Sequence, residues 1–306
     1  MRAVWIGILL MVSGIGISIF AVSLIVSYLF VLPNRSTYEE TFFSGLKHGE
    51  IIDDVFESHD KEELFLTAGD GCRLHALLFP VQKSRKAVII SHGIKWSLFG
   101  GYKYVELFQS IGYNVLLCDS RCHGLSGGSH VSYGFYEKDD LARWADELEN
   151  RFGKDLWIGV LGESLGAAAA IELMKQDRRI KFCIADSCFS DLTELCRFQL
   201  KAAVKLSVPF LIPLASGLIK RRHGWSLADI SPVSNLEQSD TPLLIIHGTK
   251  DQLVPPEMAK SLYERKKGFK KLYWIEGAGH VGGFRHNPEE YLNKIKDFIL
   301  KIEPAN

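Results

Sequence analysis

The sequence of 306 residues has no excess of charge of either sign. Lys plus Arg and Asp plus Glu number 36 each, so the formal net charge is +0 at pH 7. No basic run is interleaved with aromatic residues, as nucleic-acid-binding surfaces require, and no internal repeat is visible. We therefore expect no nucleic-acid partner. The length allows one large domain or two small ones, either of which could bury a sizeable core.

Metal-binding and disulfide patterns are also missing. The six cysteines form no Cys-x-x-Cys pair and no His/Cys cluster at the spacing of a zinc site. A chain of this size does not need disulfides, so we interpret the cysteines as buried free thiols. Free thiols fit a reducing compartment. The sequence thus predicts neither metal nor cofactor and favours a main domain in the cytoplasm.

Charge is absent from one long N-terminal run, residues 3–32. An α-helix needs about 20 apolar residues to cross the hydrocarbon core of a bilayer, and this run is longer. The alternative is a cleaved signal peptide, but its apolar region is usually about 7–15 residues with an Ala-x-Ala-like site after it, and neither feature is present. We predict a single-pass transmembrane anchor over 1–33 in the cell membrane. The basic residues on its two sides do not decide its orientation.

Beyond the anchor, residues 34–62 are polar and acidic, and we interpret them as a juxtamembrane linker with one helix around 46–57. Residues 63–306 then open with a hairpin around Asp70-Gly71. Apolar runs typical of strands buried on both faces follow at 86–93, 112–120, 155–164, 180–187, 241–248 and 270–277. Segments with helical spacing separate them, at 102–111, 135–152, 166–176 and 289–301.

This alternation predicts an α/β fold with a mostly parallel, doubly wound sheet. One segment interrupts the alternation. Residues 189–232 are helical and apolar, although a short crossover would suffice there, and we interpret them as a cap insertion.

The pentapeptide Gly162-Glu163-Ser164-Leu165-Gly166 stands between a predicted strand and a predicted helix. Glycine and serine are common in turns, so an ordinary turn is the alternative interpretation. The strand–turn–helix context is, however, that of a nucleophile elbow, where glycines on both sides leave room for a strained turn. Ser164 is therefore the predicted nucleophile, at the carboxyl edge of the sheet.

A serine nucleophile needs a base, and the base needs a group that orients it. Asp251 follows the predicted strand at 241–248, and His280 follows the strand at 270–277, so both lie at the same sheet edge as Ser164. We predict His280 as the base and Asp251 as the acid. The backbone amides of Leu165 and of Ile94, which follows the flexible Gly93, are the predicted oxyanion donors.

The other polar residues near these loops have structural interpretations. In the segment CDSRCHGLSGG (118–128), we expect Asp119, Arg121 and Ser126 to hold a glycine-rich turn, and His123 to brace it. His247 is expected to bond the backbone near Asp251.

Taken together, five motifs resemble those of the α/β-hydrolase superfamily over residues 64–302: SHGIKWS, CDSRCHGLSGG, GESLG, HGTKDQLVP and GAGH. The chain is most similar to the bacterial esterase, lipase and serine-aminopeptidase-like branch, including members with an N-terminal membrane anchor. The resemblance implies cofactor-independent hydrolysis through an acyl-enzyme, with Ser164, Asp251 and His280 as the triad. Cys122 departs from the pattern of this branch, whose members commonly have glycine before the His-Gly pair that is His123-Gly124 here.

The anchor and the apolar cap favour a lipid-like acyl ester or thioester as substrate. An aminopeptidase-like activity is the alternative, with Glu163, Asp191 or Glu194 as candidates for binding a substrate amine. An inactive hydrolase fold that serves as a binding module is a third interpretation. The oligomeric state stays open.

Overall fold

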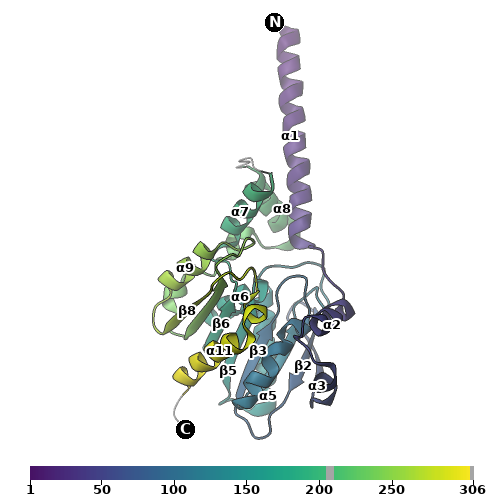
Figure 1. Cartoon of the computed structure of the whole chain (residues 1–306). Coiled ribbons are helices and arrows are strands. Elements are labelled where there is room, and N and C mark those ends of the chain that lie inside the picture. The colour runs from purple at the N-terminus through teal and green to yellow at the C-terminus, as the bar shows by residue number, and fades with distance from the viewer. Residues whose placement is uncertain (205–209, 304–306) are drawn as a thin grey trace.

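A computed structural model describes residues 1–204 and 210–303. It consists of an α/β domain from which one long helix, α1 (Arg2–Val31), projects (Figure 1). The α/β-hydrolase fold and the mostly parallel sheet expected from the sequence are confirmed. Residues 205–209 of the predicted cap insertion, and 304–306 at the end of the predicted hydrolase domain, lie outside the described residues.

In the described part of the chain, eight strands form one sheet in the order β1-β2-β4-β3-β5-β6-β7-β8. The strands are β1 (Glu62–Thr67), β2 (Arg73–Phe79), β3 (Lys86–Ser91), β4 (Asn114–Asp119), β5 (Trp157–Glu163), β6 (Ile180–Asp186), β7 (Leu243–Gly248) and β8 (Lys270–Ile275). β2 is antiparallel to both of its neighbours, and β3 to β8 are parallel. The parallel strands therefore all end at one edge of the sheet.

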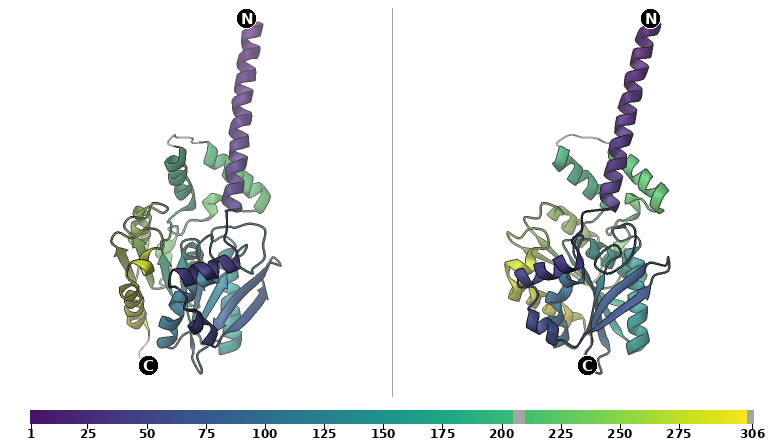
Figure 2. Two further views of the ribbon diagram at one scale, coloured as in Figure 1. Left: turned by 45° about the vertical axis from the view of Figure 1, so that its right-hand side comes forward. Right: turned by 90° about the vertical axis from the view of Figure 1, so that its right-hand side faces the viewer.

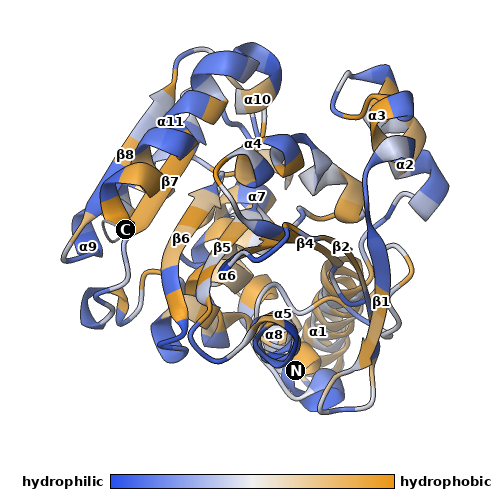
Figure 3. Cartoon of the chain, turned by 90° about the horizontal axis from the view of Figure 1, so that it is seen from below, coloured by the Kyte–Doolittle hydropathy of each residue, from blue (hydrophilic) through white to orange (hydrophobic). Residues whose placement is uncertain are grey.

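Helices cover both faces, because successive side chains of a buried strand point to opposite sides. On β3, Ala87 and Ile89 pack into one core and Val88 and Ile90 into the other. The first core is covered by α5 (Glu137–Phe152), α6 (Leu165–Gln176) and α9 (Pro256–Arg265). The second is covered by η1 (Leu98–Tyr104), α4 (Val105–Ser110), α10 (Gly283–His286) and α11 (Pro288–Ile302). Figure 3 shows the apolar central strands between these layers.

Three details differ from the prediction. The linker holds two helices, α2 (Tyr38–Lys47) and α3 (Asp53–Ser58), where one was expected around 46–57. The predicted helix at 102–111 is a 3₁₀ turn, η1, followed by the short α4. Strand β8 is not buried on both faces. It pairs only with β7, and of its six described residues only Ile275 is buried, so it is the edge strand of the sheet.

The cap between β6 and β7 contains α7 (Leu192–Val204), α8 (Leu211–His223), η2 (Leu227–Asp229) and η3 (Leu236–Gln238). Helices α7 and α8 flank the lower part of α1, seen from three sides in Figures 1 and 2, and α8 packs along α1.

Helix α1 is buried on one stripe near its C-terminal end. Ser23, Ser27 and Val31 recur every four residues and are 0%, 0% and 1% exposed. The amide of Val131 also donates to the carbonyl of Val31 at 2.9 Å. Within the described residues, this is the one helix long and apolar enough to cross a membrane, with a mean hydropathy of 2.5 over its best window. A helix of this kind fits a transmembrane anchor or a signal sequence.

Candidate active site

Ser164 occupies a strained turn between β5 and α6. Its φ is 52°, in the left-handed region that a residue with a side chain seldom adopts. The turn is possible because Gly162 and Gly166 have no Cβ. A Cβ on Gly162 would collide with the carbonyl of Gly166, and one on Gly166 would collide with the carbonyl of Ser91. The amide of Ser164 donates to the carbonyl of Asp186 at 2.8 Å, which holds the turn against β6.

His280 and Asp251 lie within hydrogen-bonding distance of this serine. The Ser164 Oγ is 2.9 Å from His280 Nε2, and His280 Nδ1 is 2.7 Å from Asp251 Oδ2. Asp251 follows β7 and His280 follows β8, so the carboxyl edge of the sheet brings all three together. The His280 side chain is 18% exposed, whereas that of Asp251 is 0% exposed. A substrate can therefore reach the serine and the imidazole, but not the carboxylate.

The environment of Asp251 fixes its charge. Burial alone would raise the pKa of this carboxyl, but the hydrogen bond and charge of His280, with the amides of Leu253 and Val254, hold the pKa below its ordinary value. Both amides donate to Oδ1 at 2.9 Å. Asp251 is thus ionised at neutral pH and accepts the Nδ1 proton of His280. The Nε2 of His280 is then free to accept the serine proton.

The loop after β3 approaches the serine closely. A Cβ built on Gly93 would lie 3.5 Å from the Ser164 Cβ, so the backbone here is in contact distance of the nucleophile. The next residue, Ile94, packs into a small cluster that contains Leu165. The Leu165 amide opens α6, where the helix dipole favours negative charge. The two predicted oxyanion donors therefore lie on adjoining segments beside Ser164.

His92 braces the Gly93 loop. Its Nε2 accepts from the Ser120 amide at 3.0 Å, so its Nδ1 carries the proton that is donated to the Gly93 carbonyl at 2.7 Å. Burial lowers the pKa of His92, which keeps the ring neutral and preserves this pair of bonds. His92 is a support of the loop that carries the Ile94 amide.

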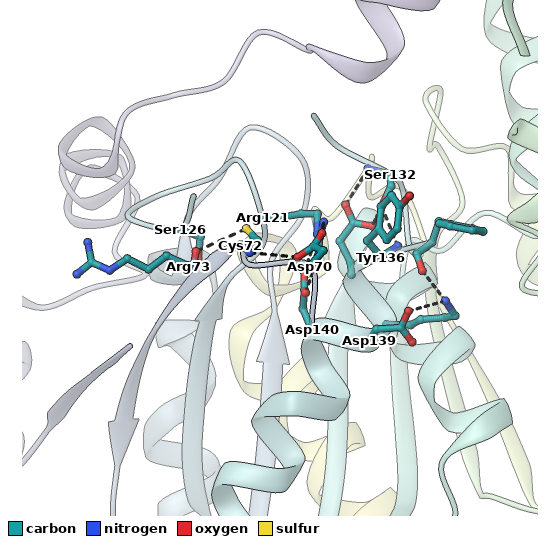
Figure 4. A network of polar contacts seen from close by, with 12 residues as sticks. Asp70, Cys72, Arg73, Arg121, Ser126, Ser132, Tyr136, Asp139 and Asp140 are labelled. Carbon is teal, nitrogen blue, oxygen red and sulfur yellow. Dashed lines mark hydrogen bonds and ion pairs between the residues drawn. The ribbon is translucent and has the colours of Figure 1, made fainter. Parts of the chain in front are cut away.

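Polar contacts hold the loop 118–128, and Figure 4 shows those of Arg121 with Asp70 and Asp140. Arg121 makes two 2.7 Å bonds to the Asp140 carboxylate and a 2.8 Å bond to Asp70. Asp119 accepts from the amides of Leu98 and Leu125. These contacts tie the loop to the β1–β2 connection and to α5.

The remaining polar side chains of this region also bond the backbone. The Ser126 hydroxyl donates to the Asp119 carbonyl at 2.8 Å, and the His123 Nδ1 donates to the Arg121 carbonyl at 2.9 Å. His247 donates to the Val254 carbonyl at 2.9 Å.

A second buried network was not predicted from the sequence. It joins the residue before Ser164 to the residue after His280 through six groups in hydrogen-bonding contact: the side chains of Glu163, Tyr104, Tyr291, Asp186 and Ser187, and the amide of Val281. The four side-chain contacts in this chain span 2.6–2.8 Å. The network therefore couples the positions of the nucleophile turn and the histidine loop.

Lys103 neutralises one end of this network. Its Nζ lies 2.7 Å from Glu163 Oε1, and the side chains are 4% and 6% exposed. Burial raises the pKa of Glu163, and Lys103 opposes that rise. Burial would lower the pKa of Lys103, but Glu163 and Glu50 raise it above its ordinary value. Glu163 is thus committed to an internal ion pair, and this excludes it as the carboxylate that binds a substrate amine.

The other two amine-binding candidates also have partners of their own. Glu194 lies in an ion pair with Arg197, and Asp191 Oδ1 accepts from the Glu194 amide at 3.0 Å. Among the described residues, no group of three or more His, Cys, Asp or Glu side chains is placed to hold a metal ion.

Replacing Lys103 by Met is expected to destabilise the fold by about 3–5 kcal/mol, because it leaves the Glu163 carboxylate buried without a counter-ion. The melting temperature of the detergent-solubilised chain should fall by roughly 10 °C. Lys260→Met is the matched control, since Lys260 is paired with Glu264 at 3.8 Å on the exposed face of α9. It should cost less than about 1 kcal/mol. The double variant Lys103→Met/Glu163→Gln should recover part of the loss, and equal effects of the two Lys variants would contradict the prediction.

Comparison with known proteins supports a hydrolase. The model of the prolyl oligopeptidase family matches residues 103–303. The uncharacterized protein YqkD of Bacillus subtilis (strain 168) is 30% identical over 294 residues, which are 95% of this chain and 96% of YqkD. The human α/β hydrolase domain-containing protein 17C is 25% identical over 218 residues, covering 71% of this chain and 58% of that protein. The structure of the Pyrococcus furiosus esterase Pf2001 is similar with a TM-score of 0.66 and 27% identity, covering 81% of this chain and 93% of the esterase.

Proposed function

This chain belongs to the prolyl oligopeptidase family of α/β hydrolases, and from that premise we propose that it is a membrane-anchored serine hydrolase of hydrophobic acyl esters or thioesters. One observation carries the proposal. Hydrogen bonds link the Ser164 hydroxyl to His280 at 2.9 Å and His280 to the ionised Asp251 at 2.7 Å.

The reaction starts when the Ser164 Oγ attacks the acyl carbonyl carbon. His280 Nε2 takes the hydroxyl proton, and Asp251 stabilises the imidazolium that forms. The amides of Leu165 and Ile94 donate to the carbonyl oxygen as it becomes negative, and the dipole of α6 adds to this stabilisation. The bond to the leaving alcohol or thiol then breaks, and His280 returns its proton to that group.

Water completes the cycle. It takes the place of the leaving group, gives a proton to His280 Nε2 and attacks the acyl group on Ser164. The serine regains its proton as the carboxylic acid is released. The reaction consumes water as its second substrate and needs no oxidant or reductant.

Two observations favour esters over amides. An aminopeptidase needs a carboxylate for the substrate amine, and the carboxylate nearest in sequence to Ser164, Glu163, is paired with Lys103. The matching archaeal structure is described as an esterase. The anchor supports a hydrophobic substrate, because α1 would keep the site at a bilayer surface.

Covalent labelling tests the proposal directly. A fluorophosphonate probe should modify the folded full-length chain, and peptide mass spectrometry should place the adduct on Ser164. Prior incubation with a p-nitrophenyl ester should slow the labelling, whereas an aminoacyl amide should slow it less. An adduct on another residue, or a folded protein that stays unlabelled, would contradict the proposal and favour an inactive binding module.

A further inference from the structure

A groove lies between the lower end of α1 and the cap. Val26, Leu29 and Phe30 of α1 form one wall, and Leu200, Ala203 and Ile212 of α7 and α8 form the other. The cavity holds about 300 Å³. Nearly all of these side chains are apolar, so the groove suits a hydrocarbon better than a polar ligand.

The groove sits where α1 would leave the membrane. Helix α1 has 30 residues and spans about 45 Å, but a bilayer core is about 30 Å thick. Residues 4–22 of α1 are uncharged and, apart from the half-buried Ile19, exposed, and burial against the cap begins at Ser23. The exposed part alone can therefore cross the core, and the groove residues from Val26 onward would lie at its boundary.

Side chains typical of a membrane interface surround this level. The Arg222 guanidinium lies 4.4 Å from the centre of the Tyr28 ring and also bonds the Ser27 hydroxyl. Tyrosine and arginine are favoured at the boundary between headgroups and acyl chains. On the cap, Phe210, which immediately precedes α8, and Leu214 on α8 are 71% and 42% exposed. These exposed apolar side chains lie at the start of the helix that runs beside α1 in every view (Figures 1 and 2).

Two residues that line the groove also contact residues next to the proposed triad. Tyr133 lines the groove and also packs against the cluster that contains Leu165 and Ile94. On the opposite side, Gln199 lines the groove and donates to the Leu253 carbonyl at 3.1 Å. Leu253 in turn donates its amide to Asp251. The lining of the groove is thus in contact with the oxyanion side of the site through Tyr133, and with the acid side through Gln199 and Leu253.

We propose that this groove receives the acyl chain of a long-chain ester that resides in the bilayer, so that the chain leaves the membrane along α1 and its carbonyl reaches Ser164. The inference rests on the proposed hydrolase function and adds the substrate class. A bilayer lipid is the occupant that the structure favours, because the outer end of the groove is formed by the anchor itself.

Chain length is the first readout of this proposal. The full-length protein is reconstituted in vesicles of phosphatidylcholine and phosphatidylglycerol, and hydrolysis of p-nitrophenyl butyrate in water is compared with that of p-nitrophenyl palmitate in the bilayer. Among short-chain p-nitrophenyl esters dissolved in water, each methylene that enters the groove should raise kcat/KM by about fourfold until the groove is full. The palmitate ester, which the bilayer holds beside α1, should also be hydrolysed.

Obstruction of the groove is the second readout. Ala203→Trp should lower the rate on the palmitate ester by roughly tenfold to a hundredfold, the equivalent of two or three methylene contacts, and lower the butyrate rate much less, because a short acyl chain needs little of the groove. Ala202→Trp is the matched control, because Ala202 is exposed on the same helix but does not line the groove. Leu29→Trp blocks the same groove from the α1 side, where tryptophan is tolerated at an interface.

The outcomes separate this inference from the proposed function. Hydrolysis of butyrate but not of bilayer palmitate would overturn the groove assignment and leave the serine hydrolase in place. Equal losses on both esters in Ala203→Trp and Leu29→Trp, or no loss in either, would also overturn it. A wild-type protein that hydrolyses neither ester and takes up no phosphonate would refute the hydrolase function, and the groove assignment with it.

Discussion

Replacing Ser164 by Ala should lower kcat/KM for an acyl ester by about 10⁴- to 10⁶-fold. The Oγ is the only atom removed, and it is the atom that lies 2.9 Å from His280 Nε2. Alanine keeps a Cβ at the same positive φ, so the strain of the turn is unchanged. The glycines on both sides also keep their contacts. The change therefore removes the proposed nucleophile without rebuilding the turn.

The measurement is initial-rate hydrolysis of p-nitrophenyl butyrate by the full-length chain, with phosphonate labelling in parallel. Ser261→Ala serves as the matched control, because the Ser261 hydroxyl only bonds the Glu257 carbonyl within α9. It should keep full activity. Retention of more than about a hundredth of the wild-type rate by Ser164→Ala, with an unchanged melting temperature, would mean that another group is the nucleophile.

Local signals explain why the elbow region could be predicted from the sequence. The strand β5, the turn and the helix α6 follow one another along the chain, and the glycines that permit the turn lie within two residues of Ser164. Asp251 and His280 could be placed at the same edge because parallel strands share a direction. The sequence order alone gives no distances, and these come from the packing of β7 and β8.

The buried network had no such local signal. Lys103 follows two glycines and a tyrosine and would ordinarily be exposed, because lysine is almost never fully buried unless it is paired. Its partner Glu163 is distant in the sequence and comes close only when η1 packs on β4 and β3, the strand that pairs with β5. Tyr291, on the last long helix, completes the connection to Asp186. Such contacts depend on tertiary packing, which the spacing of residues does not encode.

Two errors in the fold prediction have physical explanations as well. The sequence does contain a local signal for the start of α2. Thr37 and Glu40 form a capping box, so the helix begins at Tyr38. Strand β8 was predicted to be buried because its residues are largely apolar. Whether a strand lies at the edge of a sheet depends, however, on the order of the strands. With no strand beyond it in the described sheet, Tyr273 and Trp274 remain partly exposed.

Asp251→Asn is expected to lower kcat by about 10⁴-fold, although only one oxygen is replaced by nitrogen. The amides of Leu253 and Val254 both point at Oδ1, so an asparagine must place its carbonyl oxygen there. Its NH₂ group then faces His280 Nδ1. That nitrogen can no longer be the donor, and the imidazole proton moves to Nε2. The ring would then donate to the Ser164 Oγ and could not accept the serine proton.

The tautomer change has consequences that loss of the charge alone would not have. Asp251→Asn should fold normally, because both backbone amides keep their acceptor, and its KM should change little while kcat falls. Asp191→Asn is the control, a cap carboxylate that also accepts a backbone amide but lies outside the triad. It should behave as wild type. Asp251→Ala removes the acceptor of both amides as well as the charge, so it should lose stability in addition to activity. If Asp251→Asn kept a rate near that of the wild type, the orienting role of Asp251 would be refuted, and the His280 tautomer would have to be set by another group.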